Sequence, residues 1–279
     1  MFELMLALAL ALTASVAWGG ASVFGGQAAR TNSAFTVAWW FSFMALPGML
    51  ALAFIASGTE AFSIDSLLIG LVAGAAAVTG ATFLFFGFAK APASSVVPTS
   101  GLMSALLPVA AANVRGEHLS SLAFVGVGLA VGAIWLVASD GHRMDLTGIW
   151  YGLGSGTSFG VQFAILGFVS ERSGLWPIVG VFVGASMVGT LVVIAKRSPL
   201  RLRGTAFWLT AGGSACSVVA NTSYLYATRL GSLSLAAILA ALYAIPAVIL
   251  AAVFLKEAML PRHWLGLGIA GLATAFISV

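Results

Sequence analysis

Uninterrupted apolar stretches, each about as long as a bilayer is thick, follow one another along this chain of 279 residues. Charged residues are confined to the short segments between the stretches and make up only 7% of the chain, against 61% for hydrophobic residues. About a quarter of a soluble domain is charged, so this chain cannot cover a water-facing surface. Because a helix needs about 20 consecutive apolar residues to cross the hydrocarbon core, the sequence predicts an all-α integral membrane protein.

The apolar stretches predict ten transmembrane helices. We expect them at residues 4–26, 34–56, 66–88, 93–114, 120–139, 147–170, 176–195, 205–227, 232–255 and 262–279. An outer-membrane barrel is excluded, because its strands alternate apolar and polar residues and these stretches are continuously apolar. The leader "MFE" carries Glu3 and no positive charge, so we expect the first stretch to be a retained helix and not a signal peptide.

A repeated pattern divides the chain into two halves. The segment 106–128, "LLPVAAANVRGEHLSSLAFVGVG", and the segment 244–268, "AIPAVILAAVFLKEAMLPRHWLGLG", each hold a proline, then a glutamate, then Gly-x-Gly. The matched residues are Pro108, Glu117, Gly126 and Gly128 in the first copy and Pro246, Glu257, Gly266 and Gly268 in the second. Residues 22–27 ("SVFGGQ") match 157–162 ("TSFGVQ") in the same way, as residues 86–94 ("FGFAKAPAS") match 224–232 ("YLYATRLGS").

We therefore predict one five-helix repeat at residues 1–139, a linker at 140–146 and a second five-helix repeat at 147–279. Because each repeat has an odd number of spans, the second enters the membrane from the opposite side, which makes a 5+5 inverted repeat. Such proteins place equivalent helices around a cavity at the bilayer midplane.

The paired proline, glutamate and Gly-x-Gly signatures, the ten spans and the chain length resemble the EamA-domain branch of the drug/metabolite transporter (DMT) superfamily. The resemblance covers nearly the whole chain. It implies transport by alternating access through a central cavity lined mainly by the first, third, fourth, sixth, eighth and ninth helices. It also implies export of small metabolites, among which amino acids are one class of substrate.

Two prolines lie inside predicted helices, Pro108 in 93–114 and Pro246 in 232–255. A proline removes one backbone hydrogen bond and clashes with the preceding turn, so both helices should bend or loosen there. Recurrence of the proline in both halves favours a hinge over a kink that serves only helix contact. Glu117 and Glu257 each follow a span, and we expect them to anchor loops.

Polar residues inside the spans are the candidate ligand-binding residues. Helical spacing puts Ser214, Ser217, Asn221 and Tyr224 on one face, and Tyr151, Ser155, Ser158 and Gln162 on another. A polar group in hydrocarbon costs several kcal/mol unless it is paired, so these faces either join helices or line a cavity, and we expect a cavity. The predicted substrate-binding residues are Trp18, Ser22, Thr82, Phe86, Ser100, Ser104, Tyr151, Ser155, Ser158, Gln162, Ser217, Asn221, Tyr224 and Tyr243.

No charged residue is expected deep in a span. This disfavours proton-coupled multidrug antiport, which uses a carboxylate inside the membrane, and it disfavours sugar-phosphate exchange. His118, His142 and His263 are expected in loops, Cys216 is the only cysteine, and no Walker phosphate loop is present. We therefore expect no enzyme activity, no ATP-driven transport, no cofactor and no metal site.

The sequence thus predicts a multi-pass secondary or facilitated carrier of the inner (plasma) membrane that exports small neutral or zwitterionic metabolites such as amino acids. Its expected partners are the substrate and the lipid bilayer, with no nucleic acid. An importer or bidirectional facilitator is one alternative, and a non-transporting membrane subunit or receptor is another. Counting Lys and Arg residues in the loops under the positive-inside rule favours both termini outside the cell, whereas the resemblance implies both termini in the cytoplasm, and the sequence leaves the two orientations open.

Overall fold

A computed structural model of the chain describes residues 2–114, 121–138, 145–231, 233–254 and 260–277. These residues form helices and their connections, with no β-strand among them, so the predicted all-α fold is confirmed. The elements are α1 (Phe2–Ala29), α2 (Ala34–Ser57), α3 (Ile64–Lys90), α4 (Ala93–Val114), α5 (Ser121–Ala138), α6 (Leu146–Gly167), the 3₁₀ turn η1 (Glu171–Ser173), α7 (Trp176–Ala195), α8 (Ala206–Leu230), α9 (Leu233–Ala241), α10 (Ala244–Phe254) and α11 (Pro261–Ile277).

Six segments among the described residues are long and apolar enough to cross a membrane. They are Glu3–Ala29, Ala34–Ser57, Ile64–Lys90, Ala93–Ala111, Trp176–Ala195 and Leu233–Phe254. The last of these combines α9 and α10. Large apolar side chains such as Ile55, Leu191 and Ile194 are more than two-thirds exposed on the outer faces of these helices, at 84%, 68% and 67%. This exposure is what a lipid solvent requires, since hydrocarbon surrounds the helices there.

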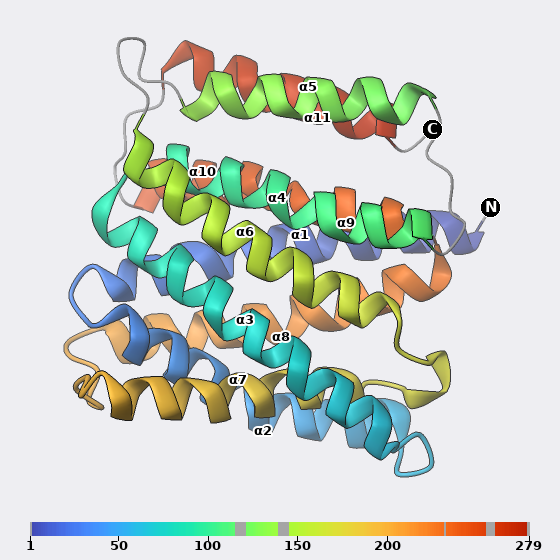
Figure 1. The fold of residues 1–279 in the computed structure, drawn as a ribbon, viewed down its shortest axis with the longest axis vertical. Coiled ribbons are helices and arrows are strands. Elements are labelled where there is room, and N and C mark those ends of the chain that lie inside the picture. The colour runs from blue at the N-terminus through green and yellow to red at the C-terminus, as the bar shows by residue number, and fades with distance from the viewer. Residues whose placement is uncertain (1, 115–120, 139–144, 232, 255–259, 278–279) are drawn as a thin grey trace.

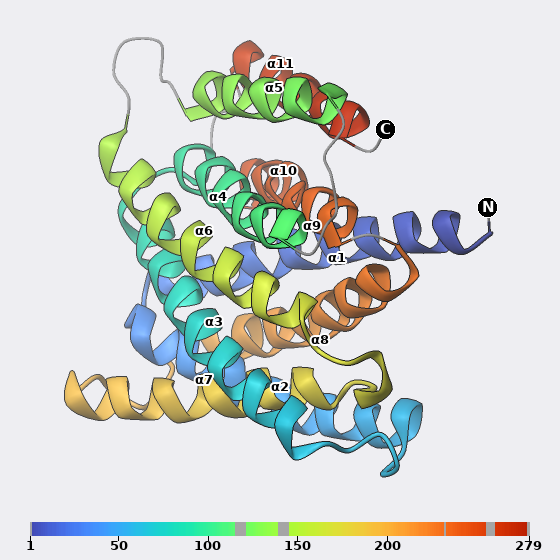
Figure 2. The ribbon, with the colours of Figure 1, turned by 45° about the vertical axis from the view of Figure 1, so that its right-hand side comes forward.

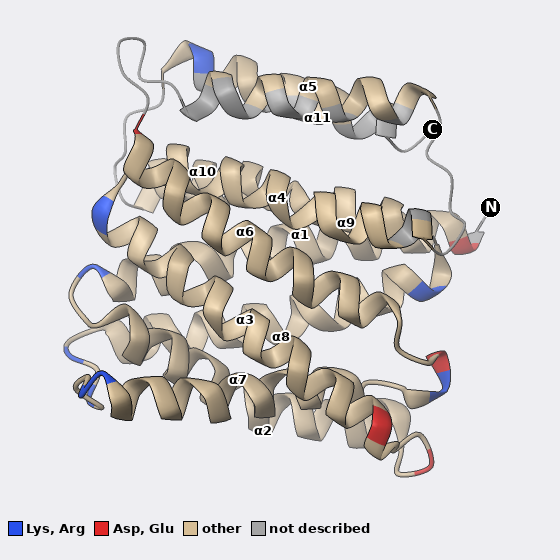
Figure 3. Ribbon diagram, viewed as in Figure 1, with Lys and Arg blue, Asp and Glu red and all other residues tan. Residues whose placement is uncertain are grey.

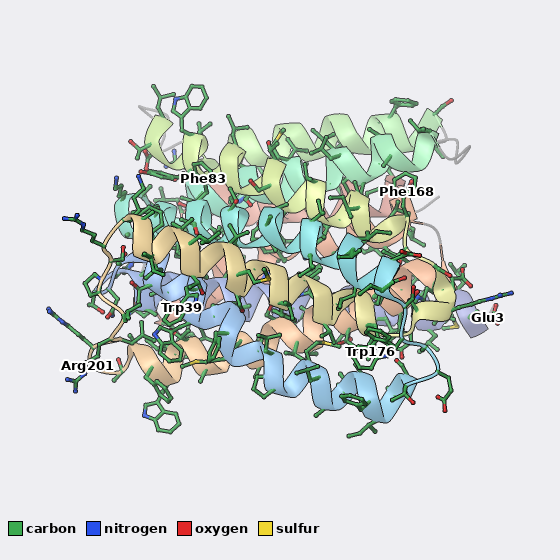
Figure 4. The ribbon with its side chains drawn as sticks, turned by 60° about the horizontal axis from the view of Figure 1, so that its bottom comes forward. Glu3, Trp39, Phe83, Phe168, Trp176 and Arg201 are labelled. Carbon is green, nitrogen blue, oxygen red and sulfur yellow. The ribbon has the colours of Figure 1, made fainter. Side chains whose placement is uncertain are left out.

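Successive helices run back and forth between two ends of the molecule (Figure 1). Glu3 and Trp176 lie at one end, and Arg201 and Trp39 lie at the other (Figure 4). We call the end that holds Glu3 the terminal end, because both chain termini lie there, and the end that holds Arg201 the basic end. Lys and Arg residues gather at the basic end, while most Asp and Glu residues lie at the terminal end (Figure 3).

The helix contacts come in exchanged pairs. The contact of α1 with α8 is paired with that of α3 with α6. The contact of α3 with α7 is paired with that of α2 with α8, and the contact of α4 with α6 is paired with that of α1 with α9 and α10. The counterparts are α1 and α6, α2 and α7, α3 and α8, and α4 and the pair α9–α10. When each helix is exchanged for its counterpart, one contact of a pair becomes the other. α5 packs along its own counterpart, α11, on the side of the molecule opposite α2 and α7 (Figure 2).

Glycines allow α3 and α7 to approach backbone to backbone. A Cβ atom on Gly74 would collide with the carbonyl oxygen of Val181, and one on Gly184 would collide with the carbonyl oxygen of Leu71. Helices in lipid gain little from hydrophobicity when they associate, so such close contact supplies the van der Waals attraction instead. The contact holds α3 of the first half against α7 of the second.

The helix predicted at 232–255 is two helices, α9 and α10, and this corrects the prediction of one continuous span. At the break, Leu242 N donates to Leu239 O at 3.2 Å, Tyr243 N to Ala240 O at 3.0 Å and Ile245 N to Leu242 O at 2.8 Å. These bonds reach back three residues and so form a tighter turn than an α-helix. Pro246 follows at once and has no N–H with which to resume the α-helical ladder.

α4 remains one helix from Ala93 to Val114 although it contains Pro98 and Pro108. The two prolines of the repeated signature therefore occupy different local structures. His263 lies in the first turn of α11 and not in a loop. Glu117, Glu257, His118, His142 and residues 140–144 of the predicted linker lie outside the described residues.

Candidate functional site

A cavity of about 70 Å³ lies between the two halves, among α1, α2, α3, α6, α7 and α8. Tyr243, at the break between α9 and α10, completes part of its wall. A buried water needs about 10–15 Å³ of such space, so the cavity has room for roughly five waters. The site is large enough for a small molecule.

Seven aromatic rings contribute to the cavity wall. They belong to Trp18, Phe41, Phe85, Phe159, Phe163, Phe182 and Tyr243. The rings of Trp18 and Phe163 lie 4.8 Å apart between centroids, and both rest on the fully buried ring of Tyr224, at 5.5 and 4.9 Å. Aromatic rings packed in this way make a rigid apolar surface on which a flat ligand can stack.

Gln162 of α6 and two residues of α8, Asn221 and Ser217, provide a hydrogen-bonded polar group in this wall. The amide nitrogen of Asn221 donates to the backbone oxygen of Ser217 at 2.8 Å and to its hydroxyl oxygen at 3.2 Å. The amide nitrogen of Gln162 then donates to Oδ1 of Asn221 at 3.1 Å. Both amides are buried, at 3% exposure, and both face the cavity.

The other serines of the wall have their hydroxyl groups engaged by their own helices. Ser22 donates to the carbonyl oxygen of Trp18 at 2.8 Å, and Ser42 donates to that of Ala38 at 3.1 Å. The polar character available to a ligand is therefore concentrated at Gln162 and its neighbours.

A second polar chain begins at the cavity and leads away from it. The hydroxyl of Tyr243 donates to Oγ of Ser100 on α4 at 2.8 Å, and Ser100 in turn donates to Oγ of Ser155 on α6 at 3.0 Å. Glycines on α6 make this contact close, since a Cβ atom on Gly156 would collide with the carbonyl oxygen of Ser100. The helix break is thus connected by hydrogen bonds to α4 of the first half and α6 of the second.

Six of the predicted substrate-binding residues line the cavity: Trp18, Ser22, Gln162, Ser217, Asn221 and Tyr243. Ser100 is hydrogen-bonded to Tyr243, and Ser155 is hydrogen-bonded to Ser100, so both lie behind the cavity wall. Tyr224 supports the rings of Trp18 and Phe163 from behind.

The other predicted residues lie elsewhere. The hydroxyl groups of Thr82, Ser104 and Ser158 bond carbonyl oxygens of their own helices. Tyr151 and Phe86 lie at the basic end, where Lys90 donates from Nζ to the hydroxyl of Tyr151 at 2.9 Å and lies over both rings. These two aromatic residues contact the amine of Lys90 and lie outside the cavity.

Sequence reasoning missed the contribution of α2 and α7, which supply Phe41, Ser42, Val181, Phe182 and Ala185 to the cavity wall. An apolar residue in an apolar span carries no signal that separates a cavity from lipid. Ser214 begins the polar face on α8 but has a different role. It donates to the carbonyl oxygen of Phe41 at 2.8 Å and so joins α8 to α2.

The polar group has no equivalent in the first half. Gln27 matches Gln162 in the repeated segment, and its Oε1 is buried without a hydrogen-bond partner in the described structure. The residue that matches Asn221 is Phe83, which is exposed. Both amides of the cavity wall therefore come from the second half, although the helix contacts of the two halves are exchanged pairs.

None of the described residues that line the cavity is charged. Among the described residues, no group of three or more His, Cys, Asp or Glu side chains could hold a metal ion. What the site can do is bind a small ligand through neutral hydrogen bonds and aromatic contact.

Comparison with known proteins identifies the fold. A solved structure described as "Crystal structure of protein" aligns with a TM-score of 0.73 and 13% sequence identity, covering 97% of this chain and 95% of that chain. No curated protein matches the chain. The profile of the EamA-like transporter family matches residues 5–139 and again residues 146–279.

The apolar helices of membrane-spanning length, together with the match to this family, define a multi-pass membrane protein of the transporter class. The chain belongs to the EamA-like transporter family, within the drug/metabolite transporter superfamily, and the resemblance noted in the sequence is confirmed. Members of this family are transporters and not enzymes.

Proposed function

We propose that this protein is a ten-helix inverted-repeat carrier that exports small neutral or zwitterionic metabolites, amino acids included, by alternating access. In this proposal α9 and α10 together make one crossing. The observation that carries the proposal is the position of the Gln162–Asn221 amide pair, buried in an uncharged cavity between the two halves. Buried amides that served only to join helices would not need to border an open space.

The exchanged helix contacts support alternating access. If one half rocks against the other, contacts such as α1 with α8 and α3 with α6 can trade roles, opening the cavity first to one end and then to the other. Transport is expected to be secondary or facilitated. The hinge is proposed at the break between α9 and α10, next to Pro246, and the substitution Pro246→Ala tests it.

The charge distribution supports an orientation. The loop between α7 and α8, which holds Lys196, Arg197, Arg201 and Arg203, lies at the basic end, whereas Glu3, the loop between α2 and α3 with Glu60, and the turn η1 with Glu171 lie at the terminal end (Figures 1 and 4). The positive-inside rule then puts the basic end in the cytoplasm of a cell whose inner membrane holds the protein. Export would proceed from the basic end to the terminal end.

The decisive experiment compares intracellular metabolite pools in cells that express the wild-type chain and in cells that express Gln162→Ala with Asn221→Ala. A specific neutral or zwitterionic pool should fall with the wild-type chain and remain at its basal level with the variant. The efflux of that compound is then measured from loaded membrane vesicles. Thr79→Ala, an exposed position on α3 whose hydroxyl bonds its own helix, is the matched control and should behave as wild type.

Other outcomes identify the alternatives. A pool that rises on expression would make the protein an importer. Unchanged pools, no flux in vesicles and a variant that fails to fold would favour a non-transporting subunit or receptor, and would contradict the proposal.

A further inference from the structure

The orientation of the Gln162 amide is set by a backbone carbonyl two hydrogen bonds away. The backbone oxygen of Ser217 can only accept, so the amide nitrogen of Asn221 must face it, at 2.8 Å. Oδ1 of Asn221 is then directed toward Gln162 and can only accept, so Gln162 must present its nitrogen, at 3.1 Å. The chain of bonds runs in one direction and leaves the carbonyl oxygen Oε1 of Gln162 at the end.

The Gln162 side chain retains hydrogen-bonding capacity for a ligand. Its bond to Asn221 is the one hydrogen bond that it makes among the described residues, although an amide offers two N–H donors and an oxygen with two lone pairs. Its amide therefore offers an acceptor oxygen and a second N–H. The complementary group on a ligand has the same pair in reverse, an N–H donor beside a C=O acceptor.

The rest of the cavity restricts the charge of the ligand. A zwitterion brings a full positive and a full negative charge, and burying a charge without a partner costs far more than burying a neutral group. Over the described part of the chain, the cavity wall contains no charged side chain. Neutral amides and hydroxyl groups compensate a full charge poorly, so an uncharged ligand fits the site better than an amino acid.

The shape and volume of the cavity restrict the ligand further. The rings of Trp18 and Phe163 border the cavity beside Gln162, tilted by 35° to one another, and each ring offers an apolar face to a ligand. Space for roughly five waters corresponds to a compact molecule of one ring with small substituents. Stacking on aromatic rings favours a planar, unsaturated ring over an aliphatic one.

We propose that the substrate is an uncharged single-ring heterocycle that presents an amide edge, N–H beside C=O, to the side chain of Gln162. This inference rests on the proposed transport function, because it takes the cavity to be the substrate site. It narrows the class of small neutral or zwitterionic metabolites to planar neutral lactams, for which uracil is the simplest probe.

The test uses the purified full chain in lipid nanodiscs and isothermal titration with three probes: uracil, 1,3-dimethyluracil and phenylalanine. Uracil carries the amide edge. 1,3-Dimethyluracil has the same ring and carbonyl groups but no N–H, and phenylalanine is a zwitterion with an aromatic ring. We expect uracil to bind at least about tenfold more tightly than 1,3-dimethyluracil, which is the effect of one well-placed hydrogen bond to a buried group. Equal affinity of these two, tighter binding of phenylalanine, or no binding of uracil would overturn the proposal.

Substitution then locates the interaction. Gln162→Met keeps the length of the side chain and removes the amide, so it should abolish the preference for uracil over 1,3-dimethyluracil, while Thr157→Ala, at an exposed position of the same helix, should retain it. If Gln162→Met does not fold, Gln162→Asn withdraws the amide by one methylene and should reduce the same preference. The wild-type comparison stands without either variant.

This binding experiment does not depend on transport. Selective uracil binding without flux would refute the transport function and leave the recognition intact. Measured efflux of an amino acid by a protein that does not bind uracil would refute the proposed recognition and leave the transport function intact.

Discussion

The hydroxyl of Tyr243 donates a hydrogen bond to Oγ of Ser100 at 2.8 Å, which joins the break between α9 and α10 to α4 in the other half of the chain. Tyr243 also lines the cavity, so one side chain contacts the binding site, the helix break and the opposite half. A ligand that displaces this ring would disturb the link between the halves.

Replacing the Tyr243 hydroxyl should slow transport. Tyr243→Phe keeps the ring in the cavity wall and removes a buried hydrogen bond worth about 1 kcal/mol. If that bond is made more strongly during the conformational change than before it, efflux falls about fivefold. Efflux from loaded proteoliposomes measures this. Thr99→Val, which removes a hydroxyl bonded to its own helix on α4, is the control and should keep the wild-type rate.

Restoring the missing N–H at the break should fuse the two helices. In Pro246→Ala the new amide can donate to Leu242 O, so α9 and α10 should become one α-helix. Hydrogen–deuterium exchange at residues 242–247 should slow by tenfold or more, and efflux should fall with it. Pro47→Ala in α2, where the proline lies exposed in a continuous helix, should change neither measurement. Unchanged efflux in a fused helix would rule out a hinge at Pro246.

The glycine contact between α3 and α7 should be intolerant of a methyl group. In Gly184→Ala the Cβ atom meets the backbone of Leu71, so the helices must separate, and overpacking of this kind costs about 1–3 kcal/mol. The melting temperature in detergent should fall by several degrees. Gly48→Ala has no atom within 4 Å of the new methyl group and should melt as the wild type does.

Trp18 and Tyr151 were both predicted to bind substrate, and the structure separates them. Trp18 lines the cavity, whereas Tyr151 lies at the basic end with Lys90. Trp18→Ala removes a stacking surface and should weaken ligand binding about tenfold. Tyr151→Phe should leave the dissociation constant within about twofold of wild type, since its ring can still lie beside Lys90. Titration of the transported compound measures both, and a large loss of affinity in Tyr151→Phe would show that the ligand binds nearer the basic end.

The basic end should face the cytoplasm. In a Cys216→Ser background, Thr205→Cys places a thiol at the basic end and Thr59→Cys places one at the terminal end, both at exposed positions. A membrane-impermeant maleimide added to intact cells should label Thr59→Cys, and it should label Thr205→Cys only after permeabilisation. The reverse pattern would put the termini in the cytoplasm.

Much of the architecture could be predicted from the chain alone. Continuous apolar stretches determine helices because lipid offers no partner for a free backbone N–H or C=O. Repeated segments such as 22–27 and 157–162 predict paired elements, and α1 and α6 do occupy exchanged positions in the contact pattern. The break at Leu242 and Tyr243 was predicted only as a loosening near Pro246, because proline is compatible with both a kinked helix and a divided one. Around Pro108, by contrast, α4 stays one undivided helix.

Prediction of the site was less complete. Gln162 and Asn221 were found because large amides are costly in hydrocarbon and have to be paired. Small hydroxyl side chains are ambiguous, since they can bond the carbonyl oxygen one turn back, as Thr82 and Ser158 do. Phe41 and Phe182 were missed because an aromatic ring is equally compatible with lipid, a helix contact and a cavity.

The sequence by itself determined the solvent of this protein, its helical class, its division into two halves and the confinement of charge to the helix ends. All of these follow from composition and spacing, because the bilayer acts on each segment separately. Only the tertiary structure decided which polar and aromatic residues meet around the cavity. That choice depends on how helices far apart in the chain cross, and close approach at glycines such as Gly74 and Gly156 determines it through contacts that no single helix contains.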